Sequence, residues 1–169
     1  MDLGSFNAAP AEELTQSLLA CADVPSWADT LVRQRPYRDI DTLLTTADTA
    51  AREFRNAEVD KALAAHPRIG ERAEGASTEA GWSRQEQSAV DNTESTQQAL
   101  LRGNQTYEER FGRVFLICAS GLSGEQILAA LRERLDNDAE TESAVVATEL
   151  RKIALLRLRR LLDQQEEQA

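Results

Sequence analysis

The sequence predicts an all-α protein, a single-domain helical bundle with one short extended apolar segment near residues 114–119. Alanine and leucine are abundant and aromatic residues make up only 5% of the chain, a composition that favours helices. Apolar residues recur at spacings of three and four in several stretches, as in helices that bury one face. A chain of 169 residues can bury a core without disulfides or metals. We therefore expect one helical domain over residues 1–162 and a polar C-terminal tail over residues 163–169.

Charge and composition exclude several classes of partner. A net charge of −10 and a pI near 4.7 argue against nucleic acid, because phosphate binding needs a positive surface. No apolar run reaches 18 residues, so we expect no membrane partner, and the N-terminus lacks a signal-peptide pattern. One histidine and two widely spaced cysteines form no metal motif. We expect a cytoplasmic protein without a metal site.

The N-terminal part of the chain predicts two scaffold helices. The first spans residues 6–22, with Pro10 in its first turn. Its inward stripe consists of Leu14, Leu18 and Leu19. The second spans residues 26–35, with Trp27, Leu31 and Val32 facing inward. Arg35-Pro36-Tyr37 ends it.

A third helix, predicted over residues 41–65, leads into the stretch His66-Pro67-Arg68-Ile69-Gly70, which holds the only histidine. Pro67 disfavours the α conformation for His66, and Gly70 tolerates the positive φ that a turn needs. Histidine has an unperturbed pKa of ~6.5, so it exchanges protons at neutral pH. We interpret this stretch, the elbow, as a candidate active-site element. The alternative is that His66 is only a turn residue.

Residues 71–81 read as a surface loop, rich in small and polar residues and without apolar periodicity. After it, Ser83 and Glu86 have the S-x-x-E spacing of a helix capping box. The pattern predicts a long polar helix from Ser83 to about Arg110. On the pattern alone, capping of the helix is favoured over chemistry as the explanation of this serine and glutamate.

The helix is interrupted at Phe111-Gly112-Arg113, and the apolar run 114–119 follows it. Six residues are too few for a helix of their own, and with β-branched Val114 and Ile117 among them the run is expected to be extended. If they are buried without a partner strand, their backbone N–H and C=O groups must bind another group, and a polar ligand is one candidate.

Two further helices complete the chain. Ser123 and Gln126 form a second capping-box pattern and begin a helix that carries Arg132, Glu133 and Arg134 on its polar face. The last helix spans residues 142–162. Stepping 100° per residue places Arg157 in the middle of its apolar stripe. A guanidinium there requires either an internal carboxylate or an anionic ligand.

These elements, in this order, resemble the OHCU decarboxylase family. The resemblance rests on the elbow, on Ser83-x-x-Glu86-Gln87, on Phe111-Gly112 leading into residues 115–119, and on Arg157-Leu158. The N-terminal stretches Phe6-Asn7, Trp27-Ala28 and Arg35-Pro36-Tyr37 match as well. The chain departs from the family pattern at Arg113-Val114 and Ser120-Gly121.

The resemblance implies an all-α homodimer without a cofactor. It also implies decarboxylation of 2-oxo-4-hydroxy-4-carboxy-5-ureidoimidazoline, a small anionic urate-derived substrate, to (S)-allantoin. It makes His66 and Glu86 the catalytic pair. The substrate-binding residues that it implies are Pro67, Ser83, Arg84, Gln85, Gln87, Ile117, Cys118, Ala119 and Arg157. Arg68 is a second candidate for holding the anion, or else a surface charge.

Two other functions compete with this interpretation. The chain could be a non-enzymatic helical interaction module in which His66 is a turn residue and Arg157 pairs with an internal carboxylate. Hydrolysis of the preceding intermediate of the same pathway ranks low, because the hydrolase has a different fold and the pattern here is helical throughout.

Overall fold

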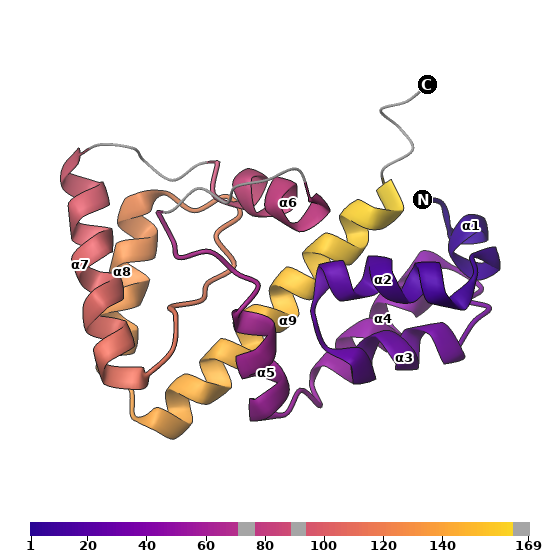
Figure 1. Cartoon of the computed structure of the whole chain (residues 1–169), viewed down its shortest axis with the longest axis horizontal. Coiled ribbons are helices and arrows are strands. Elements are labelled where there is room, and N and C mark those ends of the chain that lie inside the picture. Colours follow the sequence, from indigo (N-terminus) through magenta and orange to yellow (C-terminus); the bar gives the residue numbers. More distant parts are fainter. Residues whose placement is uncertain (71–76, 89–93, 164–169) are drawn as a thin grey trace. The chain divides into compact units, whose positions relative to one another are not determined.

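The computed structural model describes residues 1–70, 77–88 and 94–163, and over these residues the chain is helical with no β-strand (Figure 1). The predicted all-α class is confirmed for this part of the chain. The helices are α1 (Leu3–Ala8), α2 (Ala11–Cys21), α3 (Pro25–Arg33), α4 (Ile40–Ala51), α5 (Asn56–Leu63), α6 (Thr78–Glu86), α7 (Glu94–Phe111), α8 (Gly124–Leu135) and α9 (Ala139–Asp163). Among them, none is both long and apolar enough to traverse a bilayer.

The chain forms two compact units, and α9 contributes to both. The first unit comprises Met1–Ala62 together with α9 from Leu150 onward, and the second comprises Leu63–Glu149. The single-domain boundaries therefore stay a prediction.

In the first unit, α3 packs against both α2 and α4. Its core includes Phe6, Leu14, Leu18, Trp27, Leu31 and Leu43, all at most 1% exposed. The Trp27 indole N–H donates to the Ala47 carbonyl at 3.0 Å, which fixes α3 on α4. The predicted inward positions Leu14, Leu18, Trp27 and Leu31 are thus confirmed, while Leu19 and Val32 are only half-buried.

Two helices predicted as continuous are each broken in the first unit. The stretch 6–22 divides into α1 and α2 because Ala9, which precedes Pro10, adopts an extended conformation. The stretch 41–65 divides into α4 and α5. There the Glu58 carboxylate accepts the backbone N–H of Arg55 at 2.9 Å and so starts a new helix. A proline decided the first break and a side-chain cap the second, and apolar periodicity reports neither.

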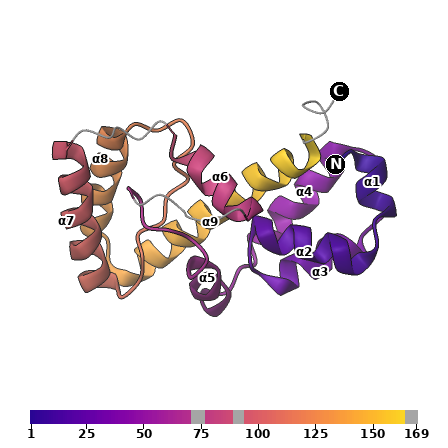
Figure 2. The ribbon, with the colours of Figure 1, turned by 45° about the horizontal axis from the view of Figure 1, so that its top comes forward.

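The second unit is built on α7 and α8, which lie side by side in both views (Figures 1 and 2). The chain between them returns from the end of α7 to the start of α8, so the two helices run parallel (Figure 1). A Cβ atom added to Gly103 would lie 2.9 Å from the Leu131 side chain, so glycine permits this close approach. The buried cluster of this unit is Ile69, Leu100, Tyr107, Phe115, Ile117, Ala119, Ile127 and Leu131.

The capping prediction at Ser83 is wrong. The N-cap of α6 is Ser77, whose hydroxyl accepts the Ala80 N–H at 3.2 Å, and Ser83 lies inside the helix. Helix α6 ends at Glu86 and α7 begins only at Glu94, so the long helix expected from Ser83 to Arg110 is also wrong. The predicted loop 71–81 is helical from Thr78, and residues 71–76 lie outside the described part.

Three predictions in the second unit are confirmed. Gly70 has a φ of +92°, the positive φ predicted for a turn at the elbow, and Gly112, directly after α7, has a φ of +68° where the helix was predicted to be interrupted. Residues 114–119 are extended and have no partner strand among the described residues. Ser123 and Gln126 form the predicted capping box at the start of α8.

Candidate active site

The histidine elbow follows directly after α5 and is held by the two helices that come next in the chain. The His66 N–H donates to the Leu63 carbonyl at 3.0 Å, which closes the last turn of α5. The Gly70 N–H donates to Oε1 of Gln87 at 3.1 Å, and the buried Asn104 amide donates to the Ile69 carbonyl at 2.9 Å. The elbow backbone is therefore hydrogen-bonded to the C-terminal end of α6 and to α7, while the His66 side chain is half-buried.

Arg68, also in the elbow, is engaged by a carboxylate of α7. Its Nε and one terminal nitrogen lie 2.6 and 3.2 Å from the two carboxylate oxygens of Glu108. The side chain of Arg68 is 45% exposed. This two-pronged pair supports the interpretation of Arg68 as a surface charge.

Helix α6 buries a serine and a glutamate on one face. Ser83 is 5% exposed and Glu86 is 6% exposed, beside Trp82 at 5%. Arg84 and Gln87 are half-buried and Gln85 is exposed. Glu86 is also the last residue of α6, where the helix dipole disfavours a negative charge. Helix stability therefore accounts for neither side chain, because Ser77 caps the helix and Glu86 stands at the wrong end of it.

The extended segment 114–119 contributes a mostly buried wall. Phe115, Leu116, Ile117 and Ala119 are buried, and Cys118 is half-buried. The Leu116 carbonyl accepts from Nη1 of Arg134 at 2.7 Å, and the Cys118 N–H donates to a carboxylate oxygen of Glu149 at 2.9 Å. The sequence analysis named a polar ligand as one candidate partner for the backbone groups of this segment. For these two groups the partners are protein side chains instead.

Arg134 is buried, which contradicts its predicted place on the polar face of α8. It is 7% exposed and donates from Nε and Nη2 to Glu142 at 2.8 and 2.6 Å. Its guanidinium lies over the Phe115 ring, 4.4 Å from the centroid. The sequence held a signal for this burial. Arg134 follows Leu131 by three residues and Ile127 by seven, the same stripe spacing that revealed Arg157.

Tyr107 and Asn137 complete the cluster around Glu142. The Tyr107 hydroxyl and the Asn137 amide both donate to its carboxylate. Desolvation by burial, and then the hydrogen bond to Glu142, raise the pKa of the Tyr107 phenol well above its usual range, so it stays a donor. Tyr107 is fully buried.

Arg157 lies in the apolar stripe of α9, as predicted. It is 3% exposed, and its neighbours in the stripe, Ile153, Ala154, Leu158 and Leu161, are all buried. One terminal nitrogen is 3.5 Å from the Ala20 carbonyl oxygen, at the limit of a hydrogen bond. Arg157 belongs to the first unit, whereas the other predicted site residues belong to the second. The convergence of Arg157 with His66 and Glu86 stays a prediction.

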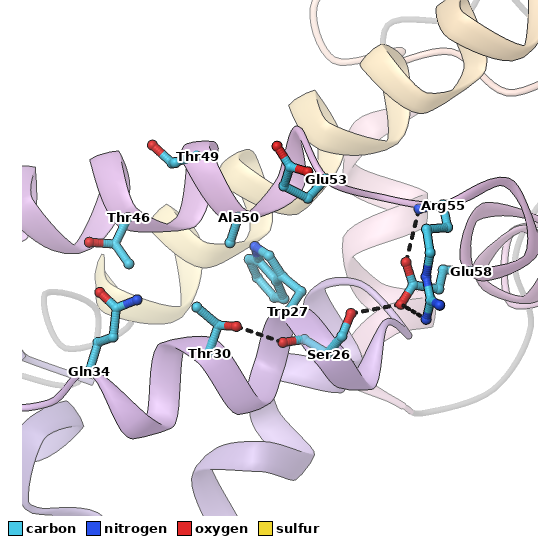
Figure 3. Close-up of a pocket in the computed structure, with 10 residues that line it drawn as sticks. All are labelled: Ser26, Trp27, Thr30, Gln34, Thr46, Thr49, Ala50, Glu53, Arg55 and Glu58. Carbon is cyan, nitrogen blue, oxygen red and sulfur yellow. Dashed lines mark hydrogen bonds and ion pairs between the residues drawn. The ribbon is translucent and has the colours of Figure 1, made fainter.

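A pocket of about 480 Å³ lies in the first unit between α3 and α4 (Figure 3). Its lining is mostly polar, with Trp27 and Ala50 as apolar members. Ser26 and Thr30 on its wall already donate to Glu58 and to the Ser26 carbonyl. It contains none of the predicted site residues.

Over residues 1–70, 77–88 and 94–163, no group of three or more histidine, cysteine or carboxylate side chains is arranged to hold a metal ion.

Solved structures share this fold. A crystal structure of OHCU decarboxylase in the presence of (S)-allantoin matches with a TM-score of 0.71 and 26% identity, covering 85% of this chain and 95% of that one. A crystal structure of (S)-allantoin synthase gives a TM-score of 0.72 over 96% of this chain and 55% of that one. At 18% identity it shows a common fold alone. The fold is thus one that a solved helical decarboxylase also has.

The sequence comparisons are more specific. The chain is 32% identical over 125 residues to a 2-oxo-4-hydroxy-4-carboxy-5-ureidoimidazoline decarboxylase of Haloferax volcanii. The match covers 73% of this chain and 73% of that protein. It is 30% identical over 146 residues to the uric acid degradation bifunctional protein TTL of Arabidopsis thaliana, 83% of this chain and 45% of that protein. The family model for OHCU decarboxylase matches residues 7–159. The chain belongs to the OHCU decarboxylase family.

Proposed function

We propose that this protein is a carboxy-lyase that converts 2-oxo-4-hydroxy-4-carboxy-5-ureidoimidazoline to (S)-allantoin in urate degradation. Family membership over residues 7–159 supports the activity. Two observations in the structure support the site. Helix α6 buries Ser83 and Glu86 without needing either for capping. The Gly70–Gln87 hydrogen bond joins the end of the same helix to the histidine elbow.

The reaction needs proton movement rather than an added electron sink. In the substrate, one carbon carries both the hydroxyl and the carboxylate and is bonded to the carbon of a C=N group. When CO2 leaves, the electron pair of the broken bond forms a C=C bond, and the C=N pair moves to nitrogen, which takes up a proton. The hydroxyl then loses its proton as a carbonyl forms, and the neighbouring carbon gains one proton and becomes the stereocentre.

We assign the proton transfers to His66 and Glu86. The imidazole can accept the hydroxyl proton or deliver the final proton to carbon, and Glu86 acts with it. A positioned acid–base group contributes roughly 10²- to 10⁴-fold to a rate. The substrate would contact Pro67, Ser83, Arg84, Gln85, Gln87, Ile117, Cys118 and Ala119. Gln85 is exposed, and so it would contact the substrate only at the mouth of the site.

Arg157 is proposed to hold the anionic groups of the substrate. It is a guanidinium in an apolar stripe, and charge pairing at short range in such surroundings outweighs the screened field of a protein with a net charge of −10. The same proposal includes a cytoplasmic homodimer that works without a cofactor. Light scattering of the purified chain would test the dimer.

The experiment that tests the function follows freshly generated urate-oxidation product by circular dichroism. We expect the protein to accelerate allantoin formation and to yield one enantiomer. His66→Ala should reduce kcat/KM by 10²- to 10⁴-fold while helicity and Tm change little. Lys61→Ala removes an exposed ion pair with Asp23 in the helix that precedes the elbow, and it should leave both quantities unchanged.

Two results would contradict the proposal. If allantoin forms no faster and no more stereoselectively with the protein than without it, the proposed activity is refuted. Parallel losses of activity and Tm in His66→Ala would make His66 a structural turn residue, as the interaction-module interpretation requires.

A further inference from the structure

The extended segment is held at the two peptide groups that flank a single residue, Ile117. The Leu116 carbonyl belongs to the peptide group on its N-terminal side and is bound by Arg134 at 2.7 Å. The Cys118 N–H belongs to the peptide group on its C-terminal side and is bound by Glu149 at 2.9 Å. Peptide groups are planar, so fixing both of them fixes φ and ψ of Ile117. No regular secondary structure provides this constraint here.

The first of these contacts is rigid because Arg134 is itself immobilised. Two of its nitrogens bind Glu142, which is 1% exposed, while the third binds Leu116. The Phe115 ring lies against the face of the guanidinium. A planar guanidinium engaged at three nitrogens has one orientation, so it cannot follow a displacement of the segment.

The second contact comes from a different helix. Glu149 is in the interior of α9, about three turns after the helix begins at Ala139, so it has no capping role at either end. Its carboxylate is directed to a backbone N–H of a segment that precedes it by 31 residues. Helices α8 and α9 therefore each supply one charged side chain to the same short stretch of backbone.

We propose that Arg134 and Glu149 are positioning residues that set the backbone of residues 116–118, and through it the placement of Ile117, Cys118 and Ala119 against the substrate. The inference rests on the proposed function, in which these three residues line the site. Since the Leu116 carbonyl and the Cys118 N–H are engaged by protein groups, these two backbone groups fix the segment and do not bind the substrate. Displacement of about 1 Å in such a wall is enough to reduce catalysis substantially.

The test compares two substitutions of Glu149. Glu149→Gln keeps an oxygen that can accept the Cys118 N–H, and Glu149→Leu removes it at similar size. We expect Glu149→Leu to lower kcat/KM about tenfold or more and to reduce the enantiomeric excess of allantoin. Glu149→Gln should keep kcat/KM within a few-fold of the wild-type value and leave the enantiomeric excess close to that of the wild type. Assays are run well below the Tm of each variant.

A matched control is available in the first unit. The Glu58 carboxylate also accepts a backbone N–H, that of Arg55, at the same 2.9 Å. Glu58→Ala should lower Tm without changing kcat/KM or the enantiomeric excess. A loss of stereoselectivity in Glu58→Ala equal to that in Glu149→Leu would overturn the inference, because the effect would then follow stability alone.

Amide hydrogen exchange tests the clamp without relying on turnover. The Cys118 amide should exchange about tenfold faster in Glu149→Leu than in the wild type and in Glu149→Gln, as expected for loss of one hydrogen bond. Unchanged exchange, or unchanged kinetics and enantiomeric excess in Glu149→Leu, would overturn the positioning role. A wild-type protein without turnover would refute the proposed function instead, and the exchange data would still decide the clamp.

Discussion

The buried carboxylate of Glu142 offers a substitution whose effect follows directly from its contacts. Glu142 is 1% exposed and accepts hydrogen bonds from Arg134, Tyr107 and Asn137. Glu142→Gln preserves the shape of the side chain and removes its charge. The Arg134 guanidinium, whose side chain is 9% exposed, is then left in the interior without its counter-charge.

The expected loss of stability is about 3 kcal/mol. Removing one partner of a buried ion pair costs about 3–5 kcal/mol. We take the lower end because the glutamine oxygen can still accept from Arg134 and Tyr107. For a chain of 169 residues, each kcal/mol shifts Tm by about 2–4 °C, so Tm should fall by roughly 6–12 °C.

Thermal and urea unfolding followed by circular dichroism measure this effect. Glu140→Gln is the matched control: Glu140 lies in the same first turn of α9 but is exposed, so it shares only the favourable interaction with the helix dipole. It should cost about 0.5 kcal/mol. A Tm loss in Glu142→Gln no larger than in Glu140→Gln would refute the reasoning, since the buried pair would then contribute nothing beyond the dipole.

Three further predictions concern capping, pH and the guanidinium of α9. Ser77→Ala removes the α6 cap and should lower the free energy of unfolding in urea by about 1 kcal/mol. Ser83→Ala should lower kcat/KM with a smaller change in stability. The reverse pattern would assign the capping role to Ser83. Hydrogen bonds from Arg55 lower the pKa of Glu58 to about 2, from a usual value of 4.5, so its contribution of about 1 kcal/mol is present above pH 4.5 and lost as pH falls toward 2. Glu58→Gln should flatten the Tm-versus-pH curve in that window, and an unchanged curve would contradict the assignment. Arg157→Met should raise KM at least tenfold with a Tm change below about 3 °C, and a stability loss of about 3–5 kcal/mol would instead indicate an internal ion pair.

The periodic and capping features of this chain could be predicted from the sequence because they depend on residues within about four positions of one another. The α9 stripe that carries Arg157, the capping box at Ser123, and the left-handed turn at Gly70 are of this kind. The order of these local features along the chain was also sufficient to predict the family, which the family model then confirmed over residues 7–159.

Local patterns failed where several residues satisfied the same rule. Ser77 and Ser83 are both plausible caps, and the choice depends on which turn is buried: packing places Ser83 beside Trp82 in the interior and leaves the exposed Ser77 to begin the helix. The prediction of a single helix over 41–65 failed for a related reason. The Glu58 carboxylate accepts the backbone N–H of Arg55, three residues earlier, and this cap begins a separate helix.

The sequence by itself therefore determined the helical class, the family, and which unusual residues required an explanation. Only the tertiary structure decided which partners those residues have. Arg134 meets Glu142 from the next helix, and Glu149 reaches a backbone N–H 31 residues earlier in the chain. Such pairs form because burial removes water from charged and peptide groups and obliges them to bind whatever polar group the packing of distant helices provides.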